Sequence, residues 1–294
     1  MSTVDRSPNH QGHLQAESTD AGRHAADTSA VRDLDLQVSP SPDPRLSINQ
    51  ATIKHADLAT ALRVTADAGL EAIEWGGDVH VSPGDTVRAP QVAKATTDAG
   101  LAVASYGSYF RSGGDEQLTP VLDSAEALGA DRIRIWGGSV GSDEATGADW
   151  AAVVERLQAA ASEAGARGIG LALEFHSGTL ADTAPTTLRL LEDVADPGLS
   201  TYWQPTVAAS VDTVIGEYRA LAARTSAAHV FSWWPAKERL PLRARDSLWT
   251  RFFAEAKAVA DPPRDALLEF VPGDDPELLV GEAAALRAYL GQPG

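Results

Sequence analysis

Short hydrophobic runs alternate with helix-like stretches along most of the chain. Four junctions share one form, in which a helix-like stretch ends in a glycine shortly before a hydrophobic run (ADAGLEAIEW, TDAGLAVASY, ALGADRIRIW and GARGIGLALEF). A glycine at this place is typical of a left-handed helix C-cap, so helices are expected to end at Gly69, Gly100, Gly129 and Gly168. The runs that follow are too short and too rich in β-branched or aromatic residues for helices, and we predict strands there.

The same alternation continues to the end of the chain and predicts eight strands. They are Leu46–Gln50, Ala72–Trp75, Ala102–Tyr106, Arg132–Trp136, Ile169–Phe175, Leu199–Gln204, Ala227–Phe231 and Ala266–Val271. A helix-like segment follows each one, the last being Pro276–Leu290. Eight βα units in roughly 250 residues are typical of a (β/α)8 TIM barrel. A doubly wound open sheet is the alternative, but no GxGxxG follows the first strand, which counts against its dinucleotide-binding form.

The first 45 residues differ in composition from the rest of the chain. Ser, Asp, His, Pro and Gln dominate there, aromatic residues are absent, and the segment ends in SPSPDPR. Such a stretch cannot bury enough apolar surface to offset the entropy lost on ordering. We therefore predict a disordered N-terminal tail over residues 1–45 and one barrel domain over residues 46–294.

Composition and charge exclude several classes of function. The formal net charge of −17 argues against a nucleic-acid binder or an anionic-membrane binder, because phosphate contacts need clustered Lys and Arg. The absence of cysteine excludes disulfides, thiolate metal sites and cysteine nucleophiles. No apolar run is long enough to cross a bilayer, and the N-terminus lacks the pattern of a secretion signal. We expect a cytoplasmic protein.

Four polar side chains lie where four successive predicted strands end: Glu174, Gln204, His229 and Glu269. In a parallel barrel, the carboxyl ends of the strands converge on one pocket. Two carboxylates, an amide oxygen and an imidazole suit Mn²⁺, Mg²⁺ or Co²⁺ better than a thiolate-seeking metal. The sequence therefore predicts a divalent metal site at this end of the barrel.

Each of these four residues also has a purely structural interpretation. A glutamate that closes a barrel strand can pair with an arginine of a neighbouring strand, and this applies to both Glu174 and Glu269. His229 can be a hydrogen-bonded core histidine, and Gln204 can be a structural amide. The sequence leaves these alternatives open.

Other polar residues near the strand ends are candidates for contact with a substrate. Glu74 ends the second strand and His80 follows in its glycine-containing loop, where both can bond sugar hydroxyls. His176 lies two residues past the glutamate of the fifth strand, so alternation places it on the same side as a possible acid or base. Lys237 and Arg239, after the seventh strand, can hold an anionic group.

Aromatic residues also gather near the strand ends. Flat aromatic faces stack on sugar rings or on an aromatic aglycone and exclude water from a pocket. We predict that four of them form pocket walls: Tyr109, Phe110, Trp203 and Trp234.

The order of the strand-end residues resembles the metal site of the xylose isomerase-like TIM-barrel superfamily. That group includes sugar isomerases, ketose 3-epimerases, inosose dehydratases and apurinic endonucleases, and the resemblance covers Leu46 to about Leu290. It implies a divalent-metal-dependent isomerase or epimerase that acts on a sugar or polyol through a metal-bound enediolate, with Mn²⁺ the expected metal. It also implies that Glu174 and Glu269 both bind the metal and exchange protons with the substrate.

The chain departs from that pattern at Gln204, where the epimerases and isomerases usually have aspartate. The amide leaves the predicted ligand set with two negative charges instead of three. Two other functions therefore stay open: a metal-dependent lyase or dehydratase, including a C-glycoside deglycosidase-like enzyme, and a catalytically inactive sugar-binding barrel. The expected partner is a small-molecule sugar or polyol, and a homo-oligomer or a small partner subunit is an open alternative.

Overall fold

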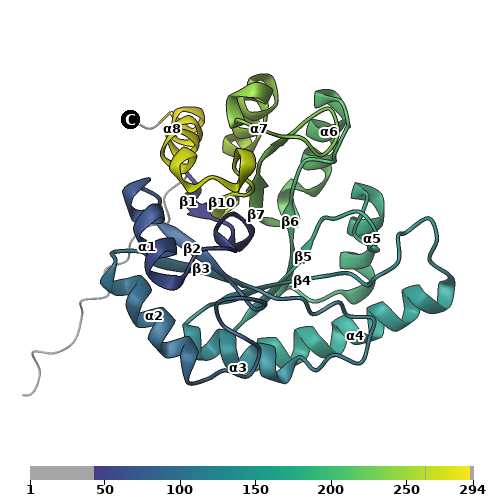
Figure 1. Ribbon diagram of the computed structural model, residues 1–294. Coiled ribbons are helices and arrows are strands. Elements are labelled where there is room, and N and C mark those ends of the chain that lie inside the picture. The colour runs from purple at the N-terminus through teal and green to yellow at the C-terminus, as the bar shows by residue number, and fades with distance from the viewer. Residues whose placement is uncertain (1–42, 262, 292–294) are drawn as a thin grey trace, which may run out of the picture. The chain divides into compact units, whose positions relative to one another are not determined.

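A closed barrel of parallel strands forms the centre of the computed structural model, which describes residues 43–261 and 263–291 (Figure 1). The tail predicted over residues 1–45 lies, as far as residue 42, outside the described residues. The predicted barrel is confirmed. Around the ring the strands follow the order β1 (Arg45–Ile48), β10 (Asp265–Leu268), β7 (Thr225–Val230), β6 (Leu199–Trp203), β5 (Gly170–Glu174), β4 (Arg132–Ile135), β3 (Ala102–Gly107) and β2 (Ala72–Gly76).

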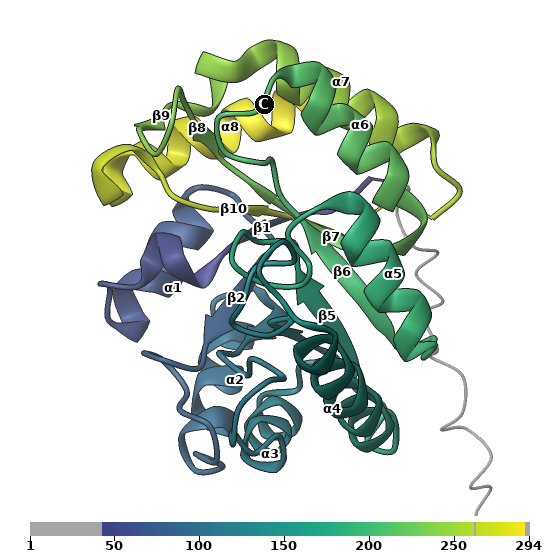
Figure 2. The same cartoon turned by 90° about the vertical axis from the view of Figure 1, so that its right-hand side faces the viewer.

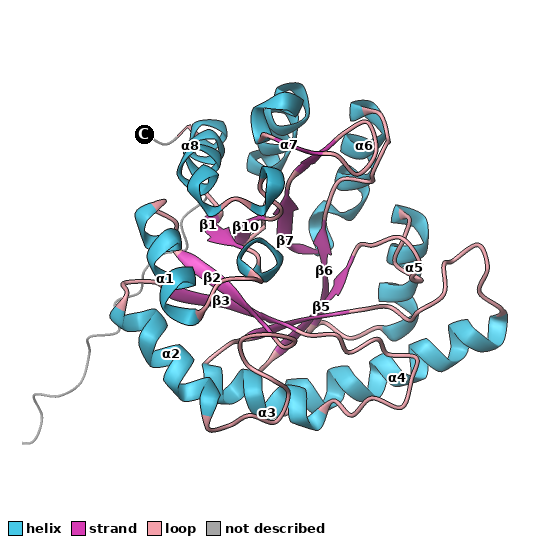
Figure 3. Ribbon diagram, in the orientation of Figure 1, coloured by secondary structure: helices cyan, strands magenta, loops and turns pink. Residues whose placement is uncertain are grey.

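Helices surround this ring of strands (Figure 3). The α-helices are α1 (Leu58–Asp67), α2 (Arg88–Asp98), α3 (Thr119–Leu128), α4 (Gly147–Gly165), α5 (Ala184–Val194), α6 (Val211–Leu221), α7 (Asp246–Ala258) and α8 (Leu279–Leu290). Short 3₁₀ helices are η1 (Gln50–Ile53), η2 (Ala222–Arg224), η3 (Leu242–Arg245), η4 (Pro272–Asp274) and η5 (Pro276–Leu278). Among the described helices, none combines the length and the apolar composition that a membrane span requires.

The predicted boundaries agree closely with the observed ones. The four glycines expected after helices have φ between 66° and 76°, which confirms the left-handed conformation at these junctions. All eight predicted strands are present, but Gln204 and Glu269 lie just after β6 and β10 instead of inside them. The prediction also missed a short antiparallel hairpin after β7, formed by β8 (Ser232–Trp233) and β9 (Arg239–Leu240) (Figure 2).

Most of the apolar core lies between the strands and the helices, and little of it lies inside the ring. A separate small apolar cluster consists of Ala72, Ala104, Ala172, Tyr202, Ala227 and Leu267. The other inward positions carry polar and charged side chains. β4 illustrates the pattern, because Arg132 and Arg134 both bond residues of other barrel strands, while Ile133 and Ile135 alternate with them and join the large core.

The amino-terminal ends of the strands hold a buried charged network, which we call the lower layer. Its centre is the fully buried Asp265, which pairs with Arg132 and accepts hydrogen bonds from Arg45 Nε (2.8 Å) and Ser47 Oγ (3.1 Å). Arg132 Nε also donates to the hydroxyl of Tyr202 (2.7 Å). Residues at this end of a TIM barrel serve stability, whereas active sites lie at the opposite end.

Candidate metal centre and active site

Three side chains meet at the carboxyl ends of the strands: Glu174 at the end of β5, His229 in β7 and Glu269 directly after β10. One ligand atom from each lies within 4.8 Å of the other two. Nδ1 of His229 is 3.5 Å from Oε2 of Glu269 and 4.0 Å from Oε1 of Glu174. All three side chains are buried. The structure thus brings together three of the four predicted ligands at distances that one divalent ion can span.

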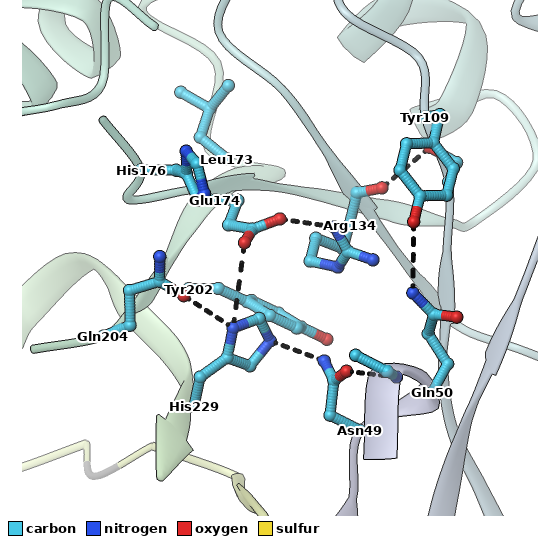
Figure 4. Close-up of polar contacts among 12 residues, drawn as sticks. Asn49, Gln50, Tyr109, Arg134, Leu173, Glu174, His176, Tyr202, Gln204 and His229 are labelled. Atoms are coloured by element: carbon cyan, nitrogen blue, oxygen red, sulfur yellow. Dashed lines mark hydrogen bonds and ion pairs between the residues drawn. The ribbon is translucent and has the colours of Figure 1, made fainter. Parts of the chain in front are cut away.

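Gln204 supplies the fourth predicted donor. Its Oε1 is 2.9 Å from Nδ1 of His229, the ring nitrogen that faces the two glutamates. On the other side of the ring, Asn49 Nδ2 lies 3.1 Å from Nε2 (Figure 4). Two carboxylates, one imidazole and one amide oxygen fit a hard or borderline divalent ion. A metal ion bound at Nδ1 would take the place of a proton on that nitrogen.

Arg134 of β4 lies inside the barrel beside this cluster and links two glutamates. Its Nη1 donates to Oε2 of Glu174, and its Nε donates to Oε1 of Glu74 at 3.3 Å. Glu74 also accepts from Asn49 Nδ2 (3.0 Å) and from Ser105 Oγ (2.8 Å). Glu174 therefore does pair with an arginine of the neighbouring strand, one of the alternatives that the sequence left open, while its Oε1 still faces His229 (Figure 4).

The electrostatics distinguish the two glutamates. Burial alone would raise the pKa of Glu174, but the charge of Arg134 and the two nearby histidines bring it below its usual value. Burial and the negative charge of Glu174 hold the pKa of Glu269 well above its usual value. Burial lowers the pKa of His229, although the neighbouring carboxylates oppose this effect. Before a cation binds, Glu269 is the carboxylate of this cluster that is most easily protonated.

A cavity of about 380 Å³ opens above the cluster. One wall contains Trp136, whose ring centroid is 4.6 Å from that of His176 and 6.4 Å from that of Tyr109. The cavity lining also contains Trp233, whose ring centroid is 4.8 Å from that of Phe270. The indole nitrogens of both tryptophans are buried without a hydrogen-bond partner among the described residues. The cavity lining thus includes two aromatic groups, whereas neighbouring atoms cover the two indole N–H donors.

Most of the predicted chemistry-bearing residues lie at this cavity. Six of them line it: Tyr109, Glu174, His176, Gln204, Lys237 and Glu269. His229 is fully buried next to them.

Three polar residues predicted to contact a substrate lie outside the cavity lining. Glu74 is fully buried, and its oxygens are taken by Asn49, Ser105 and Arg134, so it serves as a counter-ion within the barrel. His80 packs edge-on against Trp75 (5.0 Å between ring centroids), away from the residues that line the cavity. Arg239 pairs with Asp274 outside the cavity lining.

Three aromatic residues predicted as pocket walls also lie outside the cavity lining. Trp203 is fully buried and stacks on Phe252 of α7 at 4.6 Å, because alternation turns it outward between two inward-facing neighbours. Phe110 is buried in the large apolar core. Trp234 is 41% exposed and contacts Arg245 instead of the cavity.

Sequence reasoning missed Arg134, Asn49, Trp136 and Trp233 as site residues. The RIRI segment did carry a signal, since two arginines at alternate positions of a barrel strand must point inward and find buried partners. Asn49 directly follows β1, as Glu269 directly follows β10. The positions of the two tryptophans at the cavity depend on the paths of the loops that carry them, and strand alternation does not specify these paths.

Because the pKa of Glu269 is raised, metal binding should compete with protons. A proton persists on Glu269 above its ordinary titration range, and a metal ion must displace it. We therefore expect Mn²⁺ to raise the melting temperature more at about pH 8 than at about pH 5.5. Differential scanning fluorimetry with and without excess Mn²⁺ at both pH values measures this. Equal shifts at the two pH values would contradict the expectation.

Comparisons with known proteins agree with this geometry. A family model described as "Xylose isomerase-like TIM barrel" matches residues 62–237, more than half of the chain. A probable 3-DHS dehydratase from Bacillus anthracis superposes with a TM-score of 0.66 at 17% identity, over 82% of this chain and 98% of that chain. D-psicose 3-epimerase from Clostridium cellulolyticum H10, solved with D-tagatose, superposes with a TM-score of 0.65 at 14% identity, over 84% and 98%.

A third similar structure was solved with a metal ion. This xylose isomerase-like TIM-barrel protein from Mycobacterium smegmatis, in complex with magnesium, has a TM-score of 0.62 and 15% identity, over 84% of this chain and 96% of that chain. No curated protein matches the chain. At these identities the superpositions establish the fold, and the chemistry has to be argued from the site.

Proposed function

Because the chain belongs to the xylose isomerase-like TIM-barrel family, we propose that it is a divalent-metal-dependent isomerase or epimerase that acts on a sugar or polyol. One observation carries the proposal. Two buried glutamates approach the same nitrogen of His229 at the edge of a cavity of about 380 Å³. This arrangement can hold a cation and also move a proton within the same enclosed volume.

The metal would be held by Glu174, His229 and Glu269, with Gln204 as the fourth donor. When bound, it would polarise a substrate carbonyl as a Lewis acid. The set is rich in oxygen and contains one imidazole, so we propose Mn²⁺ first and Mg²⁺ or Co²⁺ as alternatives. The magnesium in the similar structure supports a hard cation.

A glutamate of the cluster would remove the proton from a carbon next to the carbonyl. The C–H electron pair becomes a C=C bond, and the carbonyl oxygen takes the negative charge. Return of a proton to carbon restores the carbonyl in an isomer or an epimer. Proton transfer of this kind contributes about 10²–10⁴-fold in rate.

The cavity walls would orient a polyhydroxylated substrate. The aromatic faces of Trp136 and Trp233 can stack on a sugar ring. Lys237 at the rim can meet a polar or anionic end of the substrate. Burial of the glutamates removes most of their hydration, which strengthens their interactions with a bound substrate.

A metal-dependent lyase or dehydratase is the second candidate, and His176 favours it. Its ring lies against Trp136 on the cavity wall, where a leaving hydroxyl or aglycone would need both an acid and an apolar surface. The replacement of aspartate by Gln204 also separates this chain from the epimerase pattern. The similarity to a probable dehydratase is consistent with this candidate.

Proton exchange in deuterium oxide tests the proposal. The Mn²⁺-loaded protein is incubated with D-fructose, D-tagatose or L-ribulose, and proton NMR follows deuterium in the recovered sugar. We expect carbon-bound deuterium next to the carbonyl, roughly one metal ion per chain by elemental analysis, and an isomer or epimer as product. A dehydrated product that disappears in His176→Gln would select the lyase. Metal-loaded protein that exchanges none of the three sugars would contradict the proposal.

A further inference from the structure

We propose that Arg134 restricts proton transfer to Glu269 alone, so that the protein takes and returns protons on one face of its substrate. This inference rests on the proposed function and sharpens it. A reaction that inverts a carbon centre needs an acid or base on each face of the substrate. A reaction that moves a carbonyl group, or that exchanges a proton with retention of configuration, needs an acid or base on one face only.

The first observation is the different bonding of the two glutamates. Oε2 of Glu174 accepts a hydrogen bond from Arg134 Nη1, while Oε1 faces His229 and the predicted metal position. Both oxygens of Glu174 are thus committed to cations. A substrate proton arriving at Oε2 would meet a guanidinium N–H already directed at that oxygen, and the buried ion pair would have to break.

Glu269 has no such partner. No described residue donates a hydrogen bond to its carboxylate, and the polar atom paired with it is Nδ1 of His229, at 3.5 Å from Oε2. Glu269 also lines the cavity. With one oxygen given to a metal, its second oxygen stays free to accept a proton from a substrate in the cavity.

The second observation is that Arg134 is fixed in place from the far side. Glu74 does not line the cavity, yet it is fully buried and accepts hydrogen bonds from Arg134, Asn49 and Ser105. It therefore acts as a dedicated counter-ion that keeps the guanidinium in the barrel. Because breaking a buried ion pair is costly, we expect Arg134 to stay on Glu174 when a substrate enters.

The backbone also makes room for this guanidinium. A Cβ at Gly107, the last residue of β3, would lie 2.8 Å from Nη2 of Arg134 and 2.9 Å from Oε1 of Glu74. The missing side chain at this strand end thus allows the arginine to reach both glutamates. Arg134 is a positioning residue: it acts through Glu174 and sets which carboxylate reacts.

The step itself balances with one carboxylate. Glu269 removes the proton from a carbon next to the carbonyl, and the C–H pair becomes a C=C bond while the carbonyl oxygen takes the charge. The protonated Glu269 exchanges with solvent and returns a proton to the same face, either to the same carbon or to the former carbonyl carbon. In the second case a hydroxyl proton moves between the two adjacent oxygens, and an aldose and a ketose interconvert.

Wild-type stereochemistry provides the direct test. D-Fructose and D-tagatose are incubated with the Mn²⁺-loaded protein in deuterium oxide, and NMR compares deuterium incorporation with formation of the C3 epimer. We expect deuterium in the recovered ketose or the aldose isomer, and epimer formation at least about 100-fold slower than exchange. An epimer that forms as fast as deuterium enters would overturn the inference and leave the proposed function intact.

Arg134→Gln provides a second test, with Arg132→Gln as the matched control. Both arginines are buried in β4 and both pair with a carboxylate, but Arg132 lies in the lower layer. Arg134→Gln should free Glu174, so the ratio of epimer to exchange should rise by about 10-fold or more. Arg132→Gln should leave this ratio unchanged. An unchanged ratio in folded, metal-loaded Arg134→Gln would overturn the inference.

A crystal structure of the Mn²⁺-loaded wild-type protein decides the geometry without any substrate. Arg134 bonded to Glu174, together with a free oxygen on Glu269, supports the inference even if the sugars above show no exchange. Lack of exchange by itself contradicts the proposed function. A loaded structure in which Arg134 has moved away from Glu174 overturns the inference.

Discussion

Glu269→Gln is expected to slow carbon–hydrogen exchange in a ketose by about 10²–10⁴-fold. Glutamine keeps an oxygen that can face the metal, but its amide cannot take up a proton from carbon. Exchange in deuterium oxide, followed by NMR with Mn²⁺-loaded protein, measures the loss directly. Elemental analysis of the same samples separates loss of the base from loss of the metal, because a variant that still holds Mn²⁺ can be compared with wild type at equal metal content.

Glu277→Gln is the matched control for this substitution. Glu277 lies in η5 near the same end of the barrel, but it is exposed and lies outside the cavity lining. We expect wild-type exchange from it. If Glu269→Gln, with its metal retained, exchanges at more than about a tenth of the wild-type rate, Glu269 is not the principal base.

Asp265→Asn should be the most destabilising single substitution in the lower layer, at about 3–5 kcal/mol. Asp265 is fully buried and pairs with Arg132 and Arg45, so its neutralisation leaves a buried guanidinium without its counter-charge. The amide is close in size to the carboxylate, so the loss is electrostatic and no cavity is created. Urea-induced unfolding followed by tryptophan fluorescence measures the change in the free energy of unfolding.

Asp274→Asn is the control, because it removes an ion pair that is partly exposed instead of buried. Asp274 also pairs with an arginine, Arg239, but its side chain is 37% exposed, so its loss should cost less than about 1 kcal/mol. Metal affinity should survive in Asp265→Asn, because this carboxylate bonds residues of the lower layer alone. An Asp265→Asn protein within about 1 kcal/mol of wild type would show that the lower layer does not determine stability.

The sequence was sufficient to predict the barrel because each local signal agreed with the fold. The glycines at positions 69, 100, 129 and 168 end helices as expected, and each hydrophobic run after them is a strand. The strand-end rule then located Glu174, His229 and Glu269, since residues after parallel strands converge whatever the loops do. The succession of strands and helices and the convergence of the strand ends follow from the topology, which a single sequence is enough to predict.

The remaining part of the site depends on contacts between distant strands. Arg134 connects β4 to Glu74 of β2 and Glu174 of β5, and no pattern within one strand states which carboxylate it reaches. Trp203 shows a different limit, because two sequence signals conflict there. Strand alternation predicts that its side chain points outward, whereas its position at a strand end suggested a place in the pocket. Trp136 and Trp233 reach the cavity through the geometry of loops, which sequence periodicity does not encode.

Inside the barrel, the lower layer around Asp265 is separated from the cluster of Glu174, His229 and Glu269. This separation has an evolutionary consequence. Asp265 and Glu269 are four residues apart along the chain, a span of about 13 Å at strand spacing, and the small apolar cluster with Leu267 lies between them. Effects of substitutions this far apart usually add independently. Substitutions around the cavity can therefore change substrate preference while the lower layer continues to stabilise the fold. A lineage carrying this barrel could explore new chemistry by small steps, each variant remaining folded.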